Sequence, residues 1–490
     1  MIYTNERVEM RNAQILKAPV YEKSDTFAVE LRKKKRRDEI LTKRFHKKED
    51  SSNEYFTNLS IEEMHCMIDQ YSTLLCTTSQ DLNTVHRILH QFRLFTCMNN
   101  APLLKMISSG IIHYLKDYVS KNTPIELLIE STWIICNLAT EAYPLVNELI
   151  ENDYLEKMID LIEINNDTIA ENCIFFIGNV AGDSIENCEA VLNSDFFKKF
   201  EQYFTIKPMQ SMNIIKTSLY TFYTISIKNL FIPATAAVTI FNFLSRVKNK
   251  INSISMHTEW LKTLCCLVSL TENYGQIFIE KRLLSRTFKY LFFNSIEIQC
   301  IVIRILGNMI VCSNRFIDML NEQNFLDKFL QLITSPNKDI RKEVYWALSN
   351  MTAGTPQHVD IFVKHAICKL GLQGLIDNDL EIKINASWLY SNIGRKGIAS
   401  NIYLLVEMGI CEYLEEALHE KNSKIMVNLI SLIQFTMISA ISEEKPDFFS
   451  IFVQTGCYDA LITAEYITEK NISSRIRNLL KELNKYYYYE

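Results

Sequence analysis

Three segments of the chain place a tryptophan four residues before an asparagine: Trp133-Ile-Ile-Cys-Asn137, Trp346-Ala-Leu-Ser-Asn350 and Trp388-Leu-Tyr-Ser-Asn392. Residues four positions apart share one face of an α-helix, so each segment presents its tryptophan and its asparagine together. Variants of the segment begin at Phe175, Tyr220, Cys265 and Arg304, and successive starts are 39 to 45 residues apart. Three of the four tryptophans in the chain begin such a segment, which argues against a chance pattern.

The repeat length predicts the fold. A period in the low forties with helical apolar spacing is typical of armadillo and HEAT repeats, whose helices bury their apolar faces only against neighbouring repeats. The chain has only 12 glycines and 9 prolines in 490 residues, which favours helices joined by short connections. We therefore expect an all-α, right-handed armadillo-repeat superhelical solenoid of about ten repeats that follows a basic N-terminal segment.

A change in composition near residue 57 predicts the domain boundary. Residues 1–56 are polar and basic, whereas helical apolar periodicity begins near Thr57 and continues to about Tyr486. We assign residues 57–490 to the repeat domain. The fourth tryptophan, Trp260, lies outside the Trp/Asn pattern and is expected in the core.

Composition argues against several classes of function. The net charge of −5 opposes binding of nucleic acid by the body of the chain. The thirteen cysteines form no CxxC pair, which indicates reduced thiols rather than a disulfide framework or a zinc site. We find no phosphate-binding loop, zinc-protease motif or nucleophile elbow, so we expect no enzyme activity, cofactor or metal. No stretch has the composition of a good membrane span, and we expect no membrane partner.

A ladder of Trp/Asn pairs along stacked helices is suited to binding an extended peptide. An asparagine amide donates and accepts hydrogen bonds, so it can hold a peptide backbone of any sequence. Neighbouring tryptophan rings form slots for lysine stems, and the ammonium group gains cation–π attraction. A single pair would more simply be a helix-linking asparagine and a core tryptophan. Three full pairs and several partial ones favour peptide binding.

These residues resemble the importin-α (karyopherin-α) family. Phe175-Phe-Ile-Gly-Asn-Val-Ala-Gly-Asp-Ser184 is similar to the third repeat of that family, and Glu343 to Gly354 resembles its seventh. Trp388 to Asn392 resembles the eighth repeat. Arg304 stands where the family tends to carry arginine in the sixth. The resemblance covers nearly the whole chain in the same order.

The resemblance implies two peptide-binding grooves. The major groove would comprise Trp133, Asn137, Glu171, Phe175, Asn179, Asp183, Tyr220 and Glu272. The minor groove would comprise Arg304, Asn308, Glu343, Trp346, Asn350, Trp388 and Asn392. Asp183 matches the acidic residue that receives the key lysine of a localisation signal, and Arg304 would pair with Glu343. Tyr220 and Thr224 depart from the family's Trp and Asn, so the minor groove is expected to be the better preserved.

The basic segment from Val29 to Arg44 resembles the second half of the family's importin-β-binding segment. Its basic residues, with one leucine, are Leu31, Arg32, Lys33, Lys34, Lys35, Arg36, Arg37, Lys43 and Arg44. The simpler alternatives are a solvated charge run or a nucleic-acid-binding tail. Under the family interpretation, Lys43-Arg44 would fold back into the chain's own groove as a mock signal until importin-β captures the segment.

The function that this resemblance implies is that of a nuclear-import adaptor. Such a protein binds lysine- and arginine-rich signals of cargo proteins, links them to importin-β and shuttles between cytoplasm and nucleus. An export receptor is a further partner in that family, and the sequence leaves open whether this chain binds it. The alternative is an armadillo scaffold of the catenin type, which would bind other extended peptides, usually acidic ones, through a basic groove.

Overall fold

The computed structural model describes residues 60–77, 81–98, 101–140, 145–207, 211–228, 231–445 and 447–487. Within these ranges every regular element is an α-helix, apart from the two short 3-10 helices η2 and η3. The chain divides into two compact units, the first ending at Leu270 and the second beginning at Thr271. The predicted boundary at residues 56 and 57 lies outside the described residues and stays a prediction.

The first unit contains thirteen α-helices and η2 in its described residues. They are α4 Ile61–Thr77, α5 Leu82–Thr96, α6 Leu103–Ser108, α7 Ile111–Leu115, η2 Lys116–Tyr118, α8 Ile125–Leu138, α9 Leu145–Glu151, α10 Tyr154–Leu161, α11 Asp167–Asp183, α12 Ile185–Asn193, α13 Phe196–Ile206, α14 Met212–Lys228, α15 Ala234–Val247 and α16 Ile254–Leu270.

The second unit continues the same pattern of short helices followed by a longer one. Its elements are α17 Glu272–Glu280, α18 Leu284–Phe288, α19 Ile296–Cys312, α20 Asn314–Glu322, α21 Phe325–Leu332, α22 Lys338–Thr352, α23 Pro356–Lys364, α24 Ala366–Gly371, η3 Leu372–Ile376, α25 Leu380–Lys396, α26 Ala399–Glu407, α27 Ile410–Ala417, α28 Ser423–Ser442, α29 Asp447–Gln454, α30 Cys457–Ile467 and α31 Lys470–Tyr487.

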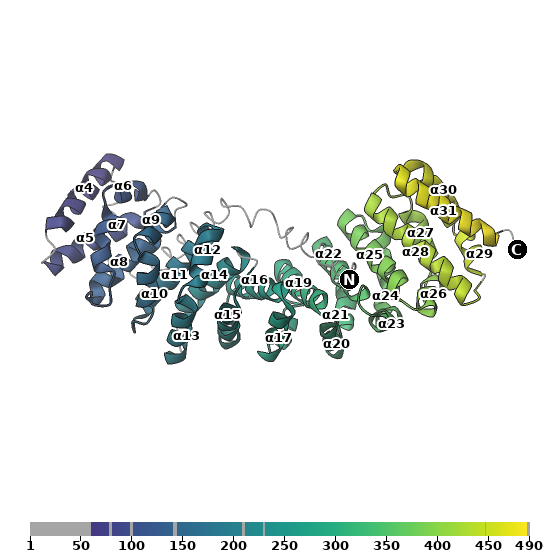
Figure 1. Ribbon diagram of the computed structural model, residues 1–490, viewed down its shortest axis with the longest axis horizontal. Helices are drawn as coiled ribbons and strands as arrows, with labels where there is room; N and C mark the ends of the chain where they lie inside the picture. The colour runs from purple at the N-terminus through teal and green to yellow at the C-terminus, as the bar shows by residue number, and fades with distance from the viewer. Residues whose placement is uncertain are drawn as a thin grey trace. The chain divides into compact units, whose positions relative to one another are not determined.

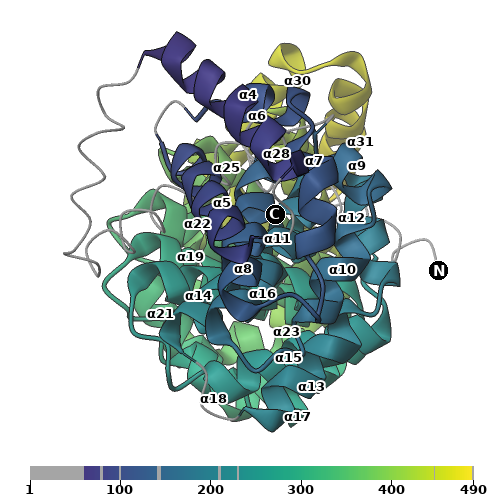
Figure 2. The ribbon, with the colours of Figure 1, turned by 90° about the vertical axis from the view of Figure 1, so that its left-hand side faces the viewer.

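Within each unit one helix of every repeat packs against its counterpart in the next repeat. We call these the ladder helices: α5, α8, α11, α14 and α16 in the first unit, and α19, α22, α25, α28 and α31 in the second. A second row, which includes α10, α13 and α15, lies beside the ladder helices of the first unit (Figures 1 and 2). The ten ladder helices of the described residues match the number of repeats that the sequence predicts.

Polar caps fix where several ladder helices begin. Asn166 accepts hydrogen bonds from the backbone N–H groups of Thr168 and Ile169 at 3.0 and 3.2 Å, and α11 starts at the next residue. Asn337 and Asn422 cap α22 and α28 in the same way. A side-chain cap satisfies N–H groups that have no partner inside the helix, so each of these residues places a helix start.

A residue in the left-handed conformation stands immediately before one of the non-ladder helices in several repeats. The φ angle is +80° at Gly110, +90° at Gly409 and +82° at Gly456, immediately before α7, α27 and α30. Asp153 and Asn324 adopt this conformation before α10 and α21. Glycine enters this region without a steric cost, and Asn and Asp tolerate it better than most residues. These positions therefore mark one turn that recurs from repeat to repeat.

The core of the first unit contains a cluster of phenylalanines. The rings of Phe200, Phe222 and Phe243 lie with centroids 4.8 to 5.6 Å apart, and all three side chains are buried. Trp260 is fully buried, and its indole N–H donates to the carbonyl of Leu244 at 3.0 Å. The prediction that Trp260 belongs to the core is confirmed.

The described residues also bear on membranes and redox chemistry. By length and composition α28 could cross a bilayer, but 67% of its most apolar window is buried inside the second unit. It packs against α25, α26 and α31, as the core helix of a repeat stack does. All thirteen cysteines lie in the described residues, and none forms a disulfide.

Candidate peptide-binding surface

The predicted groove residues lie on ladder helices, with one exception. Those of the first unit come from α8, α11 and α14, and those of the second from α19, α22 and α25; each trio packs consecutively. Glu272 is exposed at the start of α17 and belongs to the second unit, whereas the other major-groove residues belong to the first. The importin-β-binding residues from Leu31 to Arg44 lie outside the described residues.

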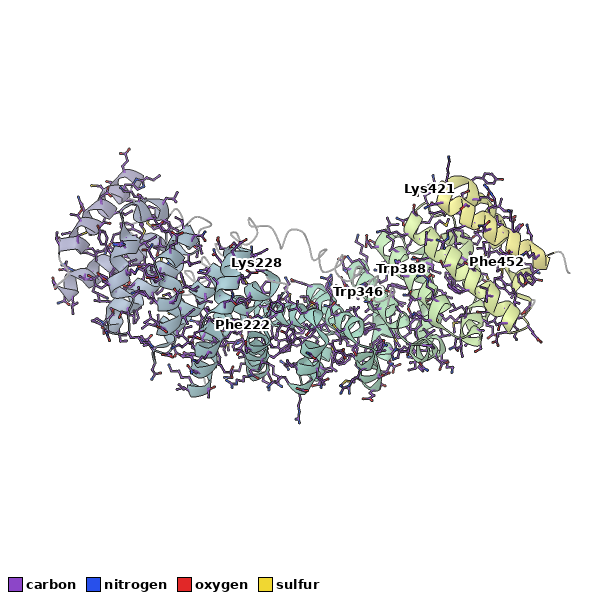
Figure 3. All side chains as sticks on the ribbon, in the orientation of Figure 1. Phe222, Lys228, Trp346, Trp388, Lys421 and Phe452 are labelled. Atoms are coloured by element: carbon purple, nitrogen blue, oxygen red, sulfur yellow. The ribbon has the colours of Figure 1, made fainter. Side chains whose placement is uncertain are left out.

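Equivalent residues on successive ladder helices define a ladder position. In the first unit it is occupied by Arg93, Trp133, Phe175, Tyr220 and Cys265, and in the second by Arg304, Trp346, Trp388, Ser431 and Arg475. Figure 3 shows Trp346 and Trp388 on the neighbouring helices α22 and α25. Each unit therefore begins this position with an arginine and continues it with a tryptophan.

Corresponding residues of the two units are separated by a constant number of residues. The interval from Trp133 to Trp346 equals the interval from Asn137 to Asn350. The same interval separates Phe175 from Trp388 and Asn179 from Asn392. A residue in one unit can therefore be compared with its counterpart in the other.

Small residues let the ladder rings lie on the preceding helix. A methyl group at Gly307 would come 2.9 Å from Cη2 of Trp346, and one at Gly178 would come 3.0 Å from the Tyr220 ring. Trp346 is 8% exposed and Tyr220 is 1% exposed. Trp133, Trp388, Asn350 and Asn392 are half-buried. Close approach of ring and helix thus sets how far each ladder ring reaches the surface.

The ladder asparagines tie neighbouring helices together. Asn179 donates from its amide to the carbonyl of Cys136 at 3.3 Å, and Asn392 donates to the carbonyl of Ser349 at 3.0 Å. Asn179 also accepts from the Tyr220 hydroxyl at 3.2 Å. Asn137 donates to the hydroxyl of Thr96 at 2.7 Å. The amide nitrogen of Asn137 also donates to the sulfur of Cys97 at 3.9 Å.

In each unit an ion pair joins the first ladder helix to the second. Arg304 reaches from α19 to both carboxylate oxygens of Glu343 on α22, with Nε 3.2 Å from Oε2. This is the pair that the sequence predicts. In the first unit, Nε of Arg93 lies 2.5 Å from Oε2 of Glu130. Both glutamates precede their tryptophan by three residues, and both arginines occupy the ladder position of the preceding helix.

Arginine side chains of the same chain lie over the rings of two tryptophans. The guanidinium carbon of Arg93 lies 4.6 Å from the centroid of the Trp133 ring, and that of Arg395 lies 5.5 Å from Trp388. A guanidinium within about 6 Å of an indole centroid is held by cation–π attraction. These rings therefore present faces on which a cation can bind.

Two buried acidic residues lie on α11, one near its start and one at its end. Asp183 is the last residue of that helix, and its carboxylate accepts from the amide of Asn187 at 3.1 Å. Lys228 donates to the main-chain carbonyl of Asp183 at 3.3 Å. Glu171 lies on the same helix and is 7% exposed. Phe175, between the two acids in sequence, packs against Tyr220 with ring centroids 5.4 Å apart.

Sequence reasoning missed Arg93, Glu130 and Arg395. The first of these was within reach: counting one repeat back from Trp133 gives Arg93, which matches the arginine that begins the second unit. Arg395 lies seven residues, or two helical turns, beyond Trp388 and so shares the helix face of its ring, but it is not part of the repeated segment. The described residues contain no cluster of His, Cys, Asp and Glu that could hold a metal ion.

Comparisons with known proteins agree with this architecture. The family model of the armadillo/β-catenin-like repeat matches residues 313–353. Importin subunit alpha-5 of Arabidopsis thaliana is 25% identical over 174 residues, which are 35% of this chain and 33% of that protein. Importin subunit alpha-1a of Oryza sativa is 23% identical over 375 residues, 74% of this chain and 69% of that protein. None of these names is that of an enzyme.

The chain thus spans about a third of the length of the Arabidopsis relative and two thirds of that of the rice one. An engineered protein of known crystal structure matches the chain with a TM-score of 0.69 and 15% identity, covering 85% of this chain and 99% of that one. At that identity the likeness concerns the fold alone. The chain is an all-α armadillo-repeat protein, and its relation to the importin-α subunits is distant.

Proposed function

We propose that the chain is a nuclear-import adaptor whose ladder helices bind lysine- and arginine-rich localisation signals. The observation that carries this proposal is the pair of tryptophan faces that already hold guanidinium groups, one of them beside a buried carboxylate. The names of its distant relatives, importin subunits alpha, support the same class of cargo. Linkage to importin-β through residues 29–44 and shuttling between cytoplasm and nucleus belong to this proposal.

The proposed binding mode uses residues of α8 and α11. Asn137 and Asn179 are 3% and 0% exposed, so an extended peptide running across these helices would have to take over their present contacts for their amides to hold its backbone. A lysine stem would pack beside Phe175, and its ammonium would reach the carboxylate of Asp183 on the same helix. Because backbone contacts are independent of sequence, selection for lysine would come from the charge of Asp183 and from the ring face.

The test uses the full chain and a labelled lysine-rich peptide, with binding followed by fluorescence anisotropy. Asp183→Lys should weaken binding at least tenfold, since a charge-assisted contact is worth about 1.5–3 kcal/mol and about 1.4 kcal/mol is one decade in affinity. Asp195→Lys is the matched control, because Asp195 is exposed at the start of α13 and forms no side-chain cap. It should leave the affinity unchanged.

Comparison peptides separate the proposed function from its alternative. A peptide with its lysines replaced by glutamine should bind at least tenfold more weakly, and an acidic peptide should not bind. Preference for the acidic peptide would instead support a scaffold of the catenin type. If Asp183→Lys has no effect on a peptide that does bind, Trp388→Ala should carry the loss, and the site would lie on the second unit.

A further inference from the structure

Arg93 makes two contacts that link α5 to α8 and one within α5. Its Nε lies 2.5 Å from Oε2 of Glu130, and its guanidinium carbon lies 4.6 Å from the centroid of the Trp133 ring. Its Nη2 lies 3.0 Å from Nδ1 of His90, which precedes it by less than one helical turn. The side chains of Glu130 and Arg93 are 10% and 15% exposed, so the group lies just below the surface.

This arrangement has the parts of a guanidinium-binding site. A carboxylate supplies the opposite charge, and the indole face supplies a flat surface on which a planar cation stacks. Glu130 and Trp133 are three residues apart on one helix, so both face the same neighbour. The same spacing recurs at Glu343 and Trp346, where Arg304 of the preceding helix pairs with the glutamate.

We propose that Glu130 and Trp133 form a guanidinium-binding site, that Arg93 is its resident ligand, and that Arg93 thereby ends the peptide-binding surface of the first unit at α8. The last part rests on the proposed function. A peptide cation cannot share a carboxylate and a ring face that Arg93 already occupies. Basic side chains of a cargo peptide would therefore bind from α11 onward, at Phe175 and Asp183, and a further cation placed past α8 would gain no contact.

The first experiment tests the site without any peptide. Arg93→Ala vacates the site, and the probe is ethylguanidinium chloride at 5–20 mM, on the order of what a weak single-site ligand requires. The probe should raise the thermal midpoint of Arg93→Ala by more than it raises that of the natural chain. Sodium chloride at equal ionic strength should not do so, and ethylammonium should do so less, because it cannot stack flat on the ring.

Two further variants make this result specific. Adding Glu130→Gln to Arg93→Ala should abolish the rescue, because the carboxylate is then absent. Arg246→Ala is the matched control, since Arg246 pairs with Glu201 in the same unit and is 44% exposed. Ethylguanidinium should not rescue that variant. Arg93→Gln keeps most of the stem and serves as the vacated site if Arg93→Ala does not fold.

The second experiment tests the limit that Arg93 sets on the peptide. A lysine-rich core peptide is compared with versions that carry one extra arginine at either end. In the natural chain neither extension should tighten binding. In Arg93→Ala one extension should tighten it about tenfold, equivalent to about 1.4 kcal/mol, and the double variant with Glu130→Gln should lose this gain.

The outcomes keep the two proposals apart. Absence of rescue in both Arg93→Ala and Arg93→Gln would overturn the guanidinium site whatever the peptides do. Rescue together with failure of the core peptide to bind would remove the peptide function and the limit, and leave the site. If the core peptide binds and an extension already gains tenfold in the natural chain, Arg93 does not end the surface.

Discussion

Gly178 allows the closest contact between α11 and α14, and its replacement by alanine tests how the ladder is held. A methyl group there would lie 2.6 Å from the hydroxyl of Thr221, 3.2 Å from its Cα and 3.0 Å from the Tyr220 ring. The Thr221 hydroxyl cannot simply rotate away at no cost, because it donates to the carbonyl of Ile174 at 2.8 Å. The helices must therefore separate.

The expected net effect is a loss of stability. Alanine favours the helix by about 1 kcal/mol over glycine. Overpacking of a tight contact costs about 1–3 kcal/mol. Separation would also break the bond between Tyr220 and Asn179, worth about 0.5–1.5 kcal/mol. The sum is a destabilisation of about 0.5–3.5 kcal/mol around α11 and α14.

Hydrogen exchange is the suitable assay, because the members of a repeat stack can open locally. Amides of α11 and α14 in Gly178→Ala should exchange faster than in the natural chain, and those of α25 and α28 should not change. Gly307→Ala is the comparison: its nearest contacts are atoms of the Trp346 ring, which is 8% exposed. It should accelerate exchange in α19 and α22 and leave α11 and α14 unchanged.

Slower exchange of α11 in Gly178→Ala would refute this reasoning. It would mean that helix propensity outweighs the contact, and that the glycine does not set the spacing of the ladder.

Three further predictions concern charge. Burial acts to raise the pKa of Glu130, but the hydrogen bond from His90 and the charge of Arg93 outweigh it and hold the pKa below its usual value. The stability from this carboxylate is present above its unfolded pKa of about 4.3 and is lost as pH falls through the folded value. Glu130→Gln should therefore be less stable than the natural chain at pH 7 in urea titrations, and the difference should shrink below about pH 4. Arg395→Ala vacates the Trp388 face and should tighten lysine-rich peptide binding in an Asp183→Lys background, as measured by anisotropy; no change would show that this face binds no peptide. Replacing Lys43 and Arg44 by alanine in the full chain should tighten cargo binding roughly several-fold if the segment competes at near-millimolar local concentration, and equal affinity would remove the proposed self-inhibition.

The sequence predicted the fold through residues whose effect is local. The Trp/Asn segments recur because each ladder helix must meet the next one with the same face, and all three full pairs lie on ladder helices. The pairing of Arg304 with Glu343 was also accessible, because the resemblance placed Arg304 at one ladder position and Glu343 three residues before the next one. Such features depend on spacing alone, and spacing is what a repeat conserves within itself.

The repeat spacing could place Arg93 at the ladder position, but the contacts of Arg93 and Arg395 with the ring faces could not be predicted in the same way. Arg395 reaches the Trp388 face from two turns further along its own helix, and Arg93 reaches Trp133 from the preceding ladder helix. Which group a long side chain reaches depends on its rotamer and on the distance between helices. How deeply each ring is buried also depended on contacts between helices, such as that of Gly307 with Trp346.

Corresponding ladder helices of the two units end in residues of opposite charge. Asp183 is the last residue of α11, and its counterpart in the second unit, Lys396, is the last residue of α25. The first unit thus has a carboxylate at this place, with the ammonium of Lys228 donating to the Asp183 carbonyl, where the second has the ammonium of Lys396, and the second also covers the Trp388 face with Arg395. A basic peptide would be attracted by the first arrangement and repelled by the second. The charges favour the first unit as the principal site under the proposed function, although its aromatic residues depart further from the importin-α pattern. Trp346 and Trp388 match the importin-α pattern better, but that match concerns which residues the helices carry. The affinity of the surface for a cation depends on the charges beside the rings.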